Sequence, residues 1–247
     1  MNLTAGGRIV LAGALLAAAT GTAGAQTGET AQGTEPQGKL TLSRYASSDG
    51  NNALDANLRG TWGDHTAWVG VYRDRAGLQQ WRAGYDHHVD SDLLRSVLSL
   101  QNASGGAWVG SASAELGGKN YAIVGWGRTN LRNYINLNYD PNDAITLGLG
   151  TRAIERTELS LFQVRDDRLH TGQRVTHWLL RRHFDDDQRL TLDFFTKRGR
   201  TSDEAFVHTH SLTVGYDRGA LFVRFTHDPH AGFTSPTQNR LSLGSRF

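Results

Sequence analysis

Short segments in which apolar and polar side chains alternate fill most of this 247-residue chain. In one of them, Leu221, Val223 and Phe225 lie on one side of an extended backbone. Arg224 and Thr226 lie on the other side. Because successive side chains of a β-strand point to opposite faces, each such segment predicts a strand with one apolar face and one polar face. Clusters of Gly, Asp, Asn and Pro separate the segments, as is typical of turns, so the chain is predicted to be all-β.

Two kinds of β protein show this alternation, namely a soluble sandwich and a transmembrane barrel whose outer face meets lipid. The repeat continues to the end of the chain with almost no helical periodicity, which would make an unusually long sandwich. The mean hydropathy of −0.46 does not exclude a barrel, because alternating strands average to neutral. Aromatic residues near the predicted strand ends favour the barrel, since they suit the two membrane interfaces. These aromatic residues are Trp62, Trp68, Tyr72, Tyr85, Trp108, Tyr121, Tyr139, Tyr216 and Phe247.

The N-terminus has the pattern of a secretory signal. Arg8 precedes an apolar run over 9–19, which is shorter than the roughly 20 residues that a membrane-spanning helix needs. Ala23 and Ala25 have the small-x-small spacing of a cleavage site. The polar residues that follow predict a disordered leader. The predicted divisions are a signal peptide over 1–25, a disordered leader over 26–38 and an outer-membrane β-barrel over 39–247.

The number of strand candidates is odd, whereas bacterial barrels have even strand numbers. One candidate is therefore expected to be wrong or to merge with another. The first candidate adjoins the polar leader and has the weakest pattern, and without it about 14 strands remain. If 119–127 and 132–139 form one strand, the number is about 12. The predicted fold class is an antiparallel up-and-down transmembrane β-barrel of about 14 strands, with 12 as the alternative. The candidates lie near 39–46, 53–62, 65–74, 79–88, 92–102, 106–115, 119–127, 132–139, 143–152, 156–165, 173–183, 188–197, 206–217, 219–227 and 239–247.

The lengths of the predicted connections predict an orientation. Counted back from Phe247, a long connection after His227 alternates with a tight turn at 217–219, and the alternation continues through the C-terminal half. Barrels of this type have short periplasmic turns and longer extracellular loops. The end that holds Phe247 is therefore expected to face the periplasm.

The last eight residues, Arg240-Leu-Ser-Leu-Gly-Ser-Arg-Phe247, resemble the C-terminal signature of bacterial outer-membrane β-barrel proteins. That signature alternates apolar residues and ends in Phe. The resemblance implies a location in the cell outer membrane, contact with outer-membrane lipid and lipopolysaccharide, and recognition by the barrel-assembly machinery during insertion. It indicates no family within the class, and it leaves open whether the chain forms a homo-oligomer.

Charged side chains on the polar faces of the strands predict the chemistry of the lumen. Rings of basic side chains bias a pore toward anions. The alternative is a lumen plugged by ion pairs between arginines and the carboxylates Asp55, Asp86 and Asp193. At about 14 strands the barrel is wider than the eight-stranded kind that side chains can fill, so a narrow channel is expected. The predicted pore-lining or solute-binding residues are Arg59, Arg82, Arg95, Asp193, Lys197, Arg224 and Arg240.

Histidines and asparagines raise alternatives to a simple pore. His208 and His210 lie two residues apart on one face, as a metal pair or a catalytic histidine of a lipid-acting barrel enzyme would. No third ligand and no nucleophile motif accompany them, so we expect no catalytic residue, metal site or cofactor. His177 falls on the same face, which we interpret as lipid-facing. Asn136 and Asn138, with Thr146, predict either a sugar-binding track or an ordinary polar stripe of the lumen.

Three functions remain after composition is considered. The net charge is only +2 with both signs interspersed, which excludes the basic block expected of a nucleic-acid partner. The first expectation is a passive outer-membrane channel for small hydrophilic, preferentially anionic, solutes. The alternatives are an outer-membrane barrel enzyme that acts on lipid or lipopolysaccharide, and a structural or polysaccharide-export barrel.

Overall fold

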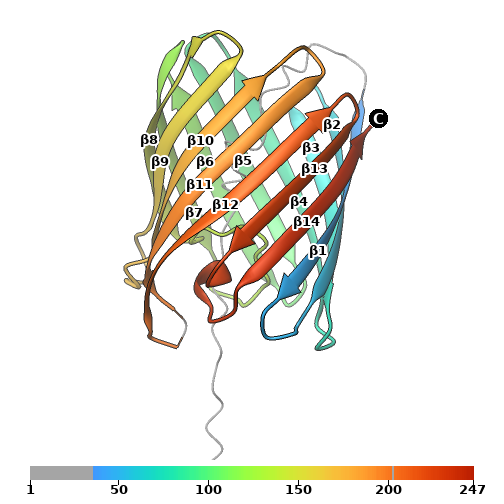
Figure 1. The fold of residues 1–247 in the computed structure, drawn as a ribbon, viewed down its shortest axis with the longest axis vertical. Coiled ribbons are helices and arrows are strands. Elements are labelled where there is room, and N and C mark those ends of the chain that lie inside the picture. The colour runs from blue at the N-terminus through green and yellow to red at the C-terminus, as the bar shows by residue number, and fades with distance from the viewer. Residues whose placement is uncertain (1–35, 202) are drawn as a thin grey trace, which may run out of the picture.

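A computed structural model describes residues 36–201 and 203–247, which form a closed antiparallel barrel of 14 strands (Figure 1). The predicted signal peptide and residues 26–35 of the predicted leader lie outside the described residues. The strands are β1 (Gln37–Ser47), β2 (Ala53–Trp62), β3 (His65–Asp74), β4 (Gln79–Asp90), β5 (Leu94–Ala103), β6 (Ala107–Leu116), β7 (Asn120–Thr129), β8 (Ala144–Ile154), β9 (Thr157–Asp166), β10 (Arg174–His183), β11 (Gln188–Arg200), β12 (Phe206–Arg218), β13 (Leu221–Asp228) and β14 (Gln238–Arg246).

The barrel closes between its first and last strands. Each strand pairs with its sequence neighbours, and β1 pairs with both β2 and β14. The backbone amide of Gly38 donates to the carbonyl of Phe247 at 2.6 Å, and the amide of Phe247 donates back at 2.9 Å. Closure leaves no unpaired strand edge in the membrane, where unsatisfied backbone groups are costly. The predicted up-and-down barrel of about 14 strands is therefore confirmed, and the 12-stranded alternative is wrong.

Two strand assignments need correction, although the total was right. The segment 39–46, which we discarded, lies within β1 and completes the barrel. The segment 132–139, which we counted, lies in the connection between β7 and β8 and pairs with no strand. Its backbone groups bond to lumenal side chains such as Gln80 instead of to a neighbouring strand.

The outer wall of the barrel is apolar. Large hydrophobic side chains such as Leu54, Leu147 and Leu243 are exposed on it, at 63%, 61% and 55% of their full accessible surface. Water would disfavour so large an exposed apolar area, and lipid favours it. None of the described residues forms a helix long and apolar enough to span a membrane. The predicted outer-membrane barrel is confirmed, with alternate residues facing lipid and lumen.

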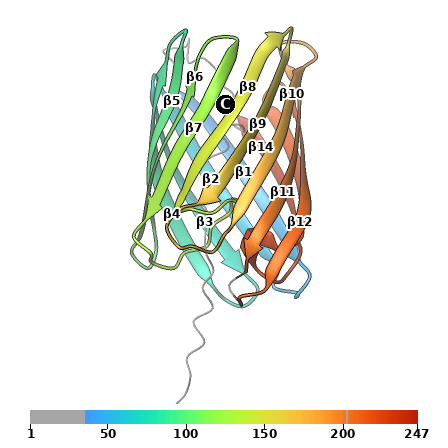
Figure 2. The same ribbon diagram turned by 90° about the vertical axis from the view of Figure 1, so that its left-hand side faces the viewer.

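The two ends of the barrel differ. The six connections at the end that holds Phe247 are tight turns, whereas the other end carries 130–143, 167–173 and 229–237 (Figures 1 and 2). Short periplasmic turns and long outer loops are the rule for this class. We refer to the Phe247 end as the periplasmic end and to the opposite end as the extracellular end.

Three lumenal aromatic rings lie over glycines of the neighbouring strand. A side chain at any of these glycines would collide with the ring above it, so the ring lies against the wall instead of projecting into the lumen. Such packing of an aromatic ring on a cross-strand glycine is a known way to fix register. The pairs are Trp68 with Gly84, Tyr121 with Gly150, and Phe222 with Gly244.

Candidate functional site: the charged lumen

The structure places the predicted pore-lining residues on the lumenal side of the wall, but in different surroundings. Arg82, Asp193 and Lys197 are buried near the extracellular end, and Arg240 lies beside them. Arg59 and Arg224 lie in the periplasmic half. Arg95 lies at the periplasmic rim, where its half-exposed guanidinium pairs with Asp90 at 3.3 Å. The set is therefore divided between two zones of the lumen.

The connection 130–143 folds into the lumen; we call it the inward loop. The side-chain amide of Gln80 donates to the carbonyl of Ile135 at 2.8 Å and accepts the amide of the same residue at 2.6 Å. Arg240 donates to the carbonyl of Leu137 at 2.7 Å. Ile135 and Leu137 also pack against an apolar cluster centred on Tyr45. Because β4 and β14 lie on a different part of the wall from β7 and β8, these contacts carry the loop across the lumen (Figure 2).

His177 holds the part of the inward loop that leads back to the wall at β8. Its Nε2 lies 2.9 Å from Asp140 of the loop, and its Nδ1 lies 3.0 Å from Asp193 on β11. Both ring nitrogens meet acceptors, which is the arrangement of an imidazolium cation. The ring stacks between Phe162 and Phe195, with centroids 4.6 and 5.0 Å away. A buried charge needs such complete pairing, so His177 is a structural clamp.

The position of His177 corrects the predicted face of β10. His177 is 3% exposed and lies in the lumen, not against lipid. Val175 and Leu179 share its lumenal face, while Trp178 and Leu180 face outward. Since apolar residues occupy both faces of this strand, an alternating pattern could not decide which face meets lipid.

Further ion pairs bind the extracellular half of the lumen together. Lys197 is fully buried, pairs with Asp228, and donates to the carbonyl of His230 at 2.8 Å. Arg82 pairs with Asp55 on a neighbouring part of the wall. In this half, the basic side chains of the predicted set are held mainly by carboxylates and loop carbonyls.

The wall of the periplasmic half formed by β13, β14, β1 and β2 has the opposite balance, whereas Arg152 and Arg181 on β8 and β10 pair with Glu115 and Glu158. We call Lys39, Arg59, Arg224 and Arg246 the basic cluster. Lys39 is the direct register partner of Arg59 on β2 and of Arg246 on β14. Like charges directly opposite each other on adjacent strands are destabilising. Arg59 pairs with Asp86 at 3.1 Å, but Lys39 and Arg224 form no ion pair with a carboxylate in the described part of the chain.

Phe222 organises the basic cluster. Its ring, which lies over Gly244, has Lys39, Arg224 and Arg246 at 4.9, 5.3 and 5.2 Å from its centroid. An aromatic face attracts cations and holds them without neutralising them. Asp217 is the carboxylate next to this group, and it is shared between Arg246 at 3.3 Å and Arg189 at 2.6 Å. The cluster therefore keeps an excess of positive charge facing the lumen.

Sequence reasoning missed Lys39 and Arg189 as lumenal cations. Lys39 was lost with the discarded first strand, although Leu40 and Leu42 carry the alternation that identifies its face. Arg189 is partly exposed and pairs with Asp217 near the start of β11, where it follows a turn. The alternation in 39–46, which precedes the clearer strand pattern of 53–62, is the signal that could have identified Lys39.

The predicted sugar track is not assembled. Asn136 donates to the carbonyl of Asn138 at 3.0 Å and accepts the amide of Asn138 at 2.9 Å, so the two form a local turn of the inward loop. Thr146 is buried on β8. The three side chains therefore do not share one strand face.

The outward histidines give no enzyme-like constellation. His208 and His210 are exposed on the lipid-facing side of β12, with ring centroids 5.6 Å apart. No group of three or more His, Asp or Glu within residues 36–201 and 203–247 is arranged to hold a metal ion.

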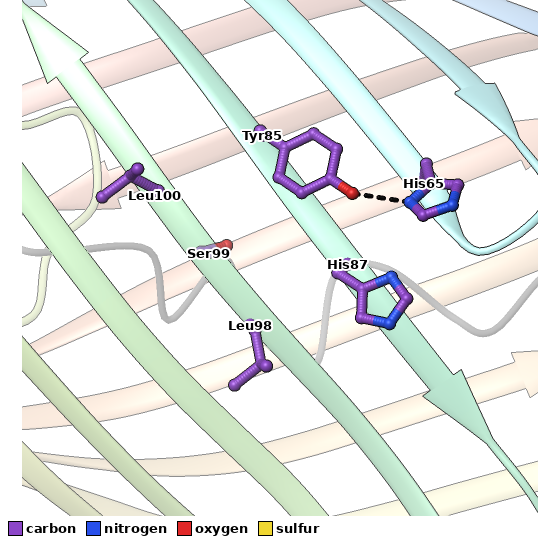
Figure 3. Close-up of a pocket in the computed structure, with 6 residues that line it drawn as sticks. All are labelled: His65, Tyr85, His87, Leu98, Ser99 and Leu100. Carbon is purple, nitrogen blue, oxygen red and sulfur yellow. Dashed lines mark hydrogen bonds between the residues drawn. The ribbon is translucent and has the colours of Figure 1, made fainter.

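A pocket on the outer wall was also considered as a site (Figure 3). His65 bonds to the hydroxyl of Tyr85 at 2.6 Å and stacks on His87 at 5.1 Å. The pocket's serine, Ser99, donates to the lumenal carboxylate of Asp86. Ser99 and His87 thus act on opposite sides of the wall, and the pocket lacks a serine activated by a histidine.

The fold defines the class: an outer-membrane β-barrel. No known protein family and no curated protein matches the sequence. Among solved structures, the chain is similar to the outer-membrane protein Omp33 of Acinetobacter baumannii, with a TM-score of 0.53 and 12% identity over 87% of this chain and 100% of that one. A porin named KdgM, in complex with disordered oligogalacturonate, gives a TM-score of 0.46 and 9% identity over 85% and 99% of the two chains. A mutant Rhodopseudomonas blastica porin gives 0.45 and 9% over 86% and 99%. The likeness to Omp33 supports the fold.

Proposed function

We propose that this protein is a passive outer-membrane channel for small hydrophilic solutes, with a preference for anions. The observation that carries the proposal is the row formed by Arg59, Lys39 and Arg246 on three adjacent strands, all facing the lumen. Its mutual repulsion is only partly offset by carboxylates. Anions that enter the lumen relieve it, as basic rings do in anion-preferring pores.

The two zones have separate roles in this proposal. The inward loop narrows the extracellular half and limits the size of the solute. The basic cluster lies on the periplasmic side of the inward loop and selects solutes by their charge. No chemical step is needed, because solutes diffuse through a lumen whose aromatic rings lie against the wall. Small organic anions and inorganic anions fit this chemistry.

Planar-bilayer recordings of the purified protein test the proposal. In a salt gradient, the zero-current potential is expected to show anion preference, because mobile anions are concentrated beside the basic cluster. Replacement of Lys39 and Arg224 together (K39Q, R224Q) is expected to reduce the anion-to-cation permeability ratio severalfold. Arg44→Gln removes one charge from the outer face of β1 and should leave the ratio unchanged.

The bilayer recordings distinguish failure of the channel proposal from failure of the role given to the basic cluster. A folded barrel that passes no current would refute the channel itself. A conducting barrel whose permeability ratio is the same in the wild type and in the double variant would refute the role of the basic cluster.

We further propose that residues 1–25 are removed on export and that the strand ending at Phe247 is read by the barrel-assembly machinery. The signal-like N-terminus and the terminal alternation support these steps. N-terminal sequencing of the protein from outer membranes should give Gln26 as the first residue. Retention of Met1 would contradict cleavage.

A further inference from the structure

A row of basic side chains crosses the outer wall near the extracellular end. Arg165 on β9 is the register partner of Arg174 on β10, Arg174 is the partner of Arg198 on β11, and Arg198 is the partner of His208 on β12. All four side chains are exposed on the outward face. We call them the exterior basic row. Neighbouring strands lie about 4.8 Å apart, so its three guanidinium groups are anchored over about 10 Å.

Strands β9 to β12 carry no acidic side chain on the outward face of the exterior basic row, and Glu204 in the connection between β11 and β12 pairs with Arg200. The acidic residues of β9 to β12 are Glu158, Asp166, Asp193 and Asp217, and all of them lie on the lumenal face. Within the described residues, Arg165, Arg174 and Arg198 form no ion pair with a carboxylate. Arg198 instead lies over the ring of Phe206 at 5.4 Å, which steadies the guanidinium without neutralising it.

The outward face of β9 to β12 differs from that of β4, β6 and β7. Near the same end, the outward faces of β4, β6 and β7 carry Trp81, Trp108 and Trp126, all exposed. On β9 to β12, a second polar row lies between the exterior basic row and the apolar wall. Its members are Gln163, Thr176, Thr196 and His210.

The height of the exterior basic row fits the headgroup layer. The first apolar row below it contains Trp178, Phe194 and Leu212. Four residues along a strand span about 13 Å, or about 10 Å along the membrane normal at a strand tilt of about 40°. The headgroup and interfacial layer on each side of the hydrocarbon is several ångströms deep, so the guanidinium groups lie within or just above it.

We propose that the exterior basic row binds the phosphate groups of a phosphorylated glycolipid in the outer leaflet, of the lipopolysaccharide type. Arginine forms bidentate hydrogen bonds with phosphate, and several arginines in one row match a headgroup with more than one phosphate. The acyl chains lie against Trp178, Phe194 and Leu212 below. The polar row between them contacts the sugar.

This site is independent of conduction, because it lies on the opposite side of the wall from the lumen. Arg165 and Arg174 belong to strands whose lumenal faces contribute Val164 and Val175 to buried apolar clusters. Changing the outward side chains leaves that packing in place. The site and the channel can therefore fail separately.

The test uses the purified full-length barrel in detergent, with bisphosphorylated lipid A as the probe. Binding is followed by native mass spectrometry. The wild type is expected to retain lipid A, and the triple variant R165Q, R174Q, R198Q is expected to bind it at least about tenfold more weakly, because it lacks the three guanidinium groups that donate charge-assisted hydrogen bonds to phosphate. The matched control R182Q, R218Q removes outward arginines from β10 and β12 at the periplasmic end and should bind as the wild type does.

Further arms identify the ligand chemistry. Dephosphorylated lipid A should bind the wild type as weakly as lipid A binds the triple variant, and millimolar inorganic phosphate should not displace lipid A. The triple variant with lysines at the same three positions should have an affinity for lipid A between those of the wild type and the glutamine variant. Its binding would also show that changes at these positions leave the barrel folded. Equal lipid A affinity in the wild type and the glutamine triple variant, or equal affinity of the wild type for lipid A and dephosphorylated lipid A, would overturn the proposal.

Discussion

The extracellular half of the lumen and the periplasmic wall formed by β13, β14, β1 and β2 treat charge in different ways. In the extracellular half, buried cations such as His177 and Lys197 meet the carboxylates of Asp140 and Asp228. In the periplasmic half, Lys39 faces two arginines across adjacent strands. The first half is built for rigidity, since paired buried charges fix geometry. The second is left with charge that solutes in the lumen can meet.

The largest effect is expected from breaking the clamp. His177→Ala leaves Asp140 and Asp193 buried without their shared cation, and removal of one partner from a buried pair costs about 3–5 kcal/mol. The free energy of unfolding, measured by urea titration in detergent micelles, should fall by that amount. The inward loop should also detach, which would increase single-channel conductance.

The matched control for the clamp is His210→Ala, because His210 is an exposed histidine on the outer face. It should change stability by less than about 0.5 kcal/mol. If the two variants lose the same stability, the extracellular half is not rigidified by this pairing.

A smaller effect is expected from loosening the far attachment of the inward loop. Gln80→Ala removes both hydrogen bonds to the backbone of Ile135 and leaves those groups unsatisfied, at a cost of about 1–3 kcal/mol. Conductance should rise, and the anion-to-cation permeability ratio should stay the same, because the basic cluster is untouched. A changed ratio with unchanged conductance would show that the two halves are not separable. Gln79→Ala, on the outward side of the same strand, is the control.

The smallest effect on stability, and a specific effect on charge, is expected in the periplasmic half. Asp217→Asn removes the negative charge shared by Arg189 and Arg246, with a stability change of about 1 kcal/mol, because the asparagine keeps an oxygen that can accept from Arg189 and both arginines are partly exposed. The permeability ratio should move further toward anions. The shift should shrink at 1 M salt, where the Debye length is about 3 Å. A shift toward cations would contradict an electrostatic role for the cluster.

The alternating pattern was enough to predict the class and most lumenal faces, and the predicted strand number is right because the omission of 39–46 offset the inclusion of 132–139. It failed where the lumen contains its own apolar surface. Ile135 and Leu137 alternate as they would in a spanning strand, but they pack inside the barrel beside Tyr45. On β10, the lumenal Val175 packs in one cluster with Tyr139 and Phe233 of two connections, and the lumenal Leu179 packs with side chains of other strands. An alternating pattern distinguishes polar from apolar surroundings, and it cannot distinguish lipid from a folded loop.

The basic cluster was only partly predictable for a related reason. Arg59 and Arg224 were recognised one strand at a time, but their relation to Lys39 depends on closure between β1 and β14, which are about 200 residues apart in the chain. Register between strands so distant follows from the whole circuit of the barrel. Local residue patterns do not contain it.

The rings that lie over lumenal glycines determine how the diameter of the passage can vary. Trp68 and Phe222 occupy the space that a side chain at Gly84 or Gly244 would fill, so the diameter depends on residues that have no side chain. A single methyl group added at either position forces the ring off the wall and toward the axis. Small changes in passage width are therefore available through alanine at a glycine, without any change in strand number or in the charges that face the solute.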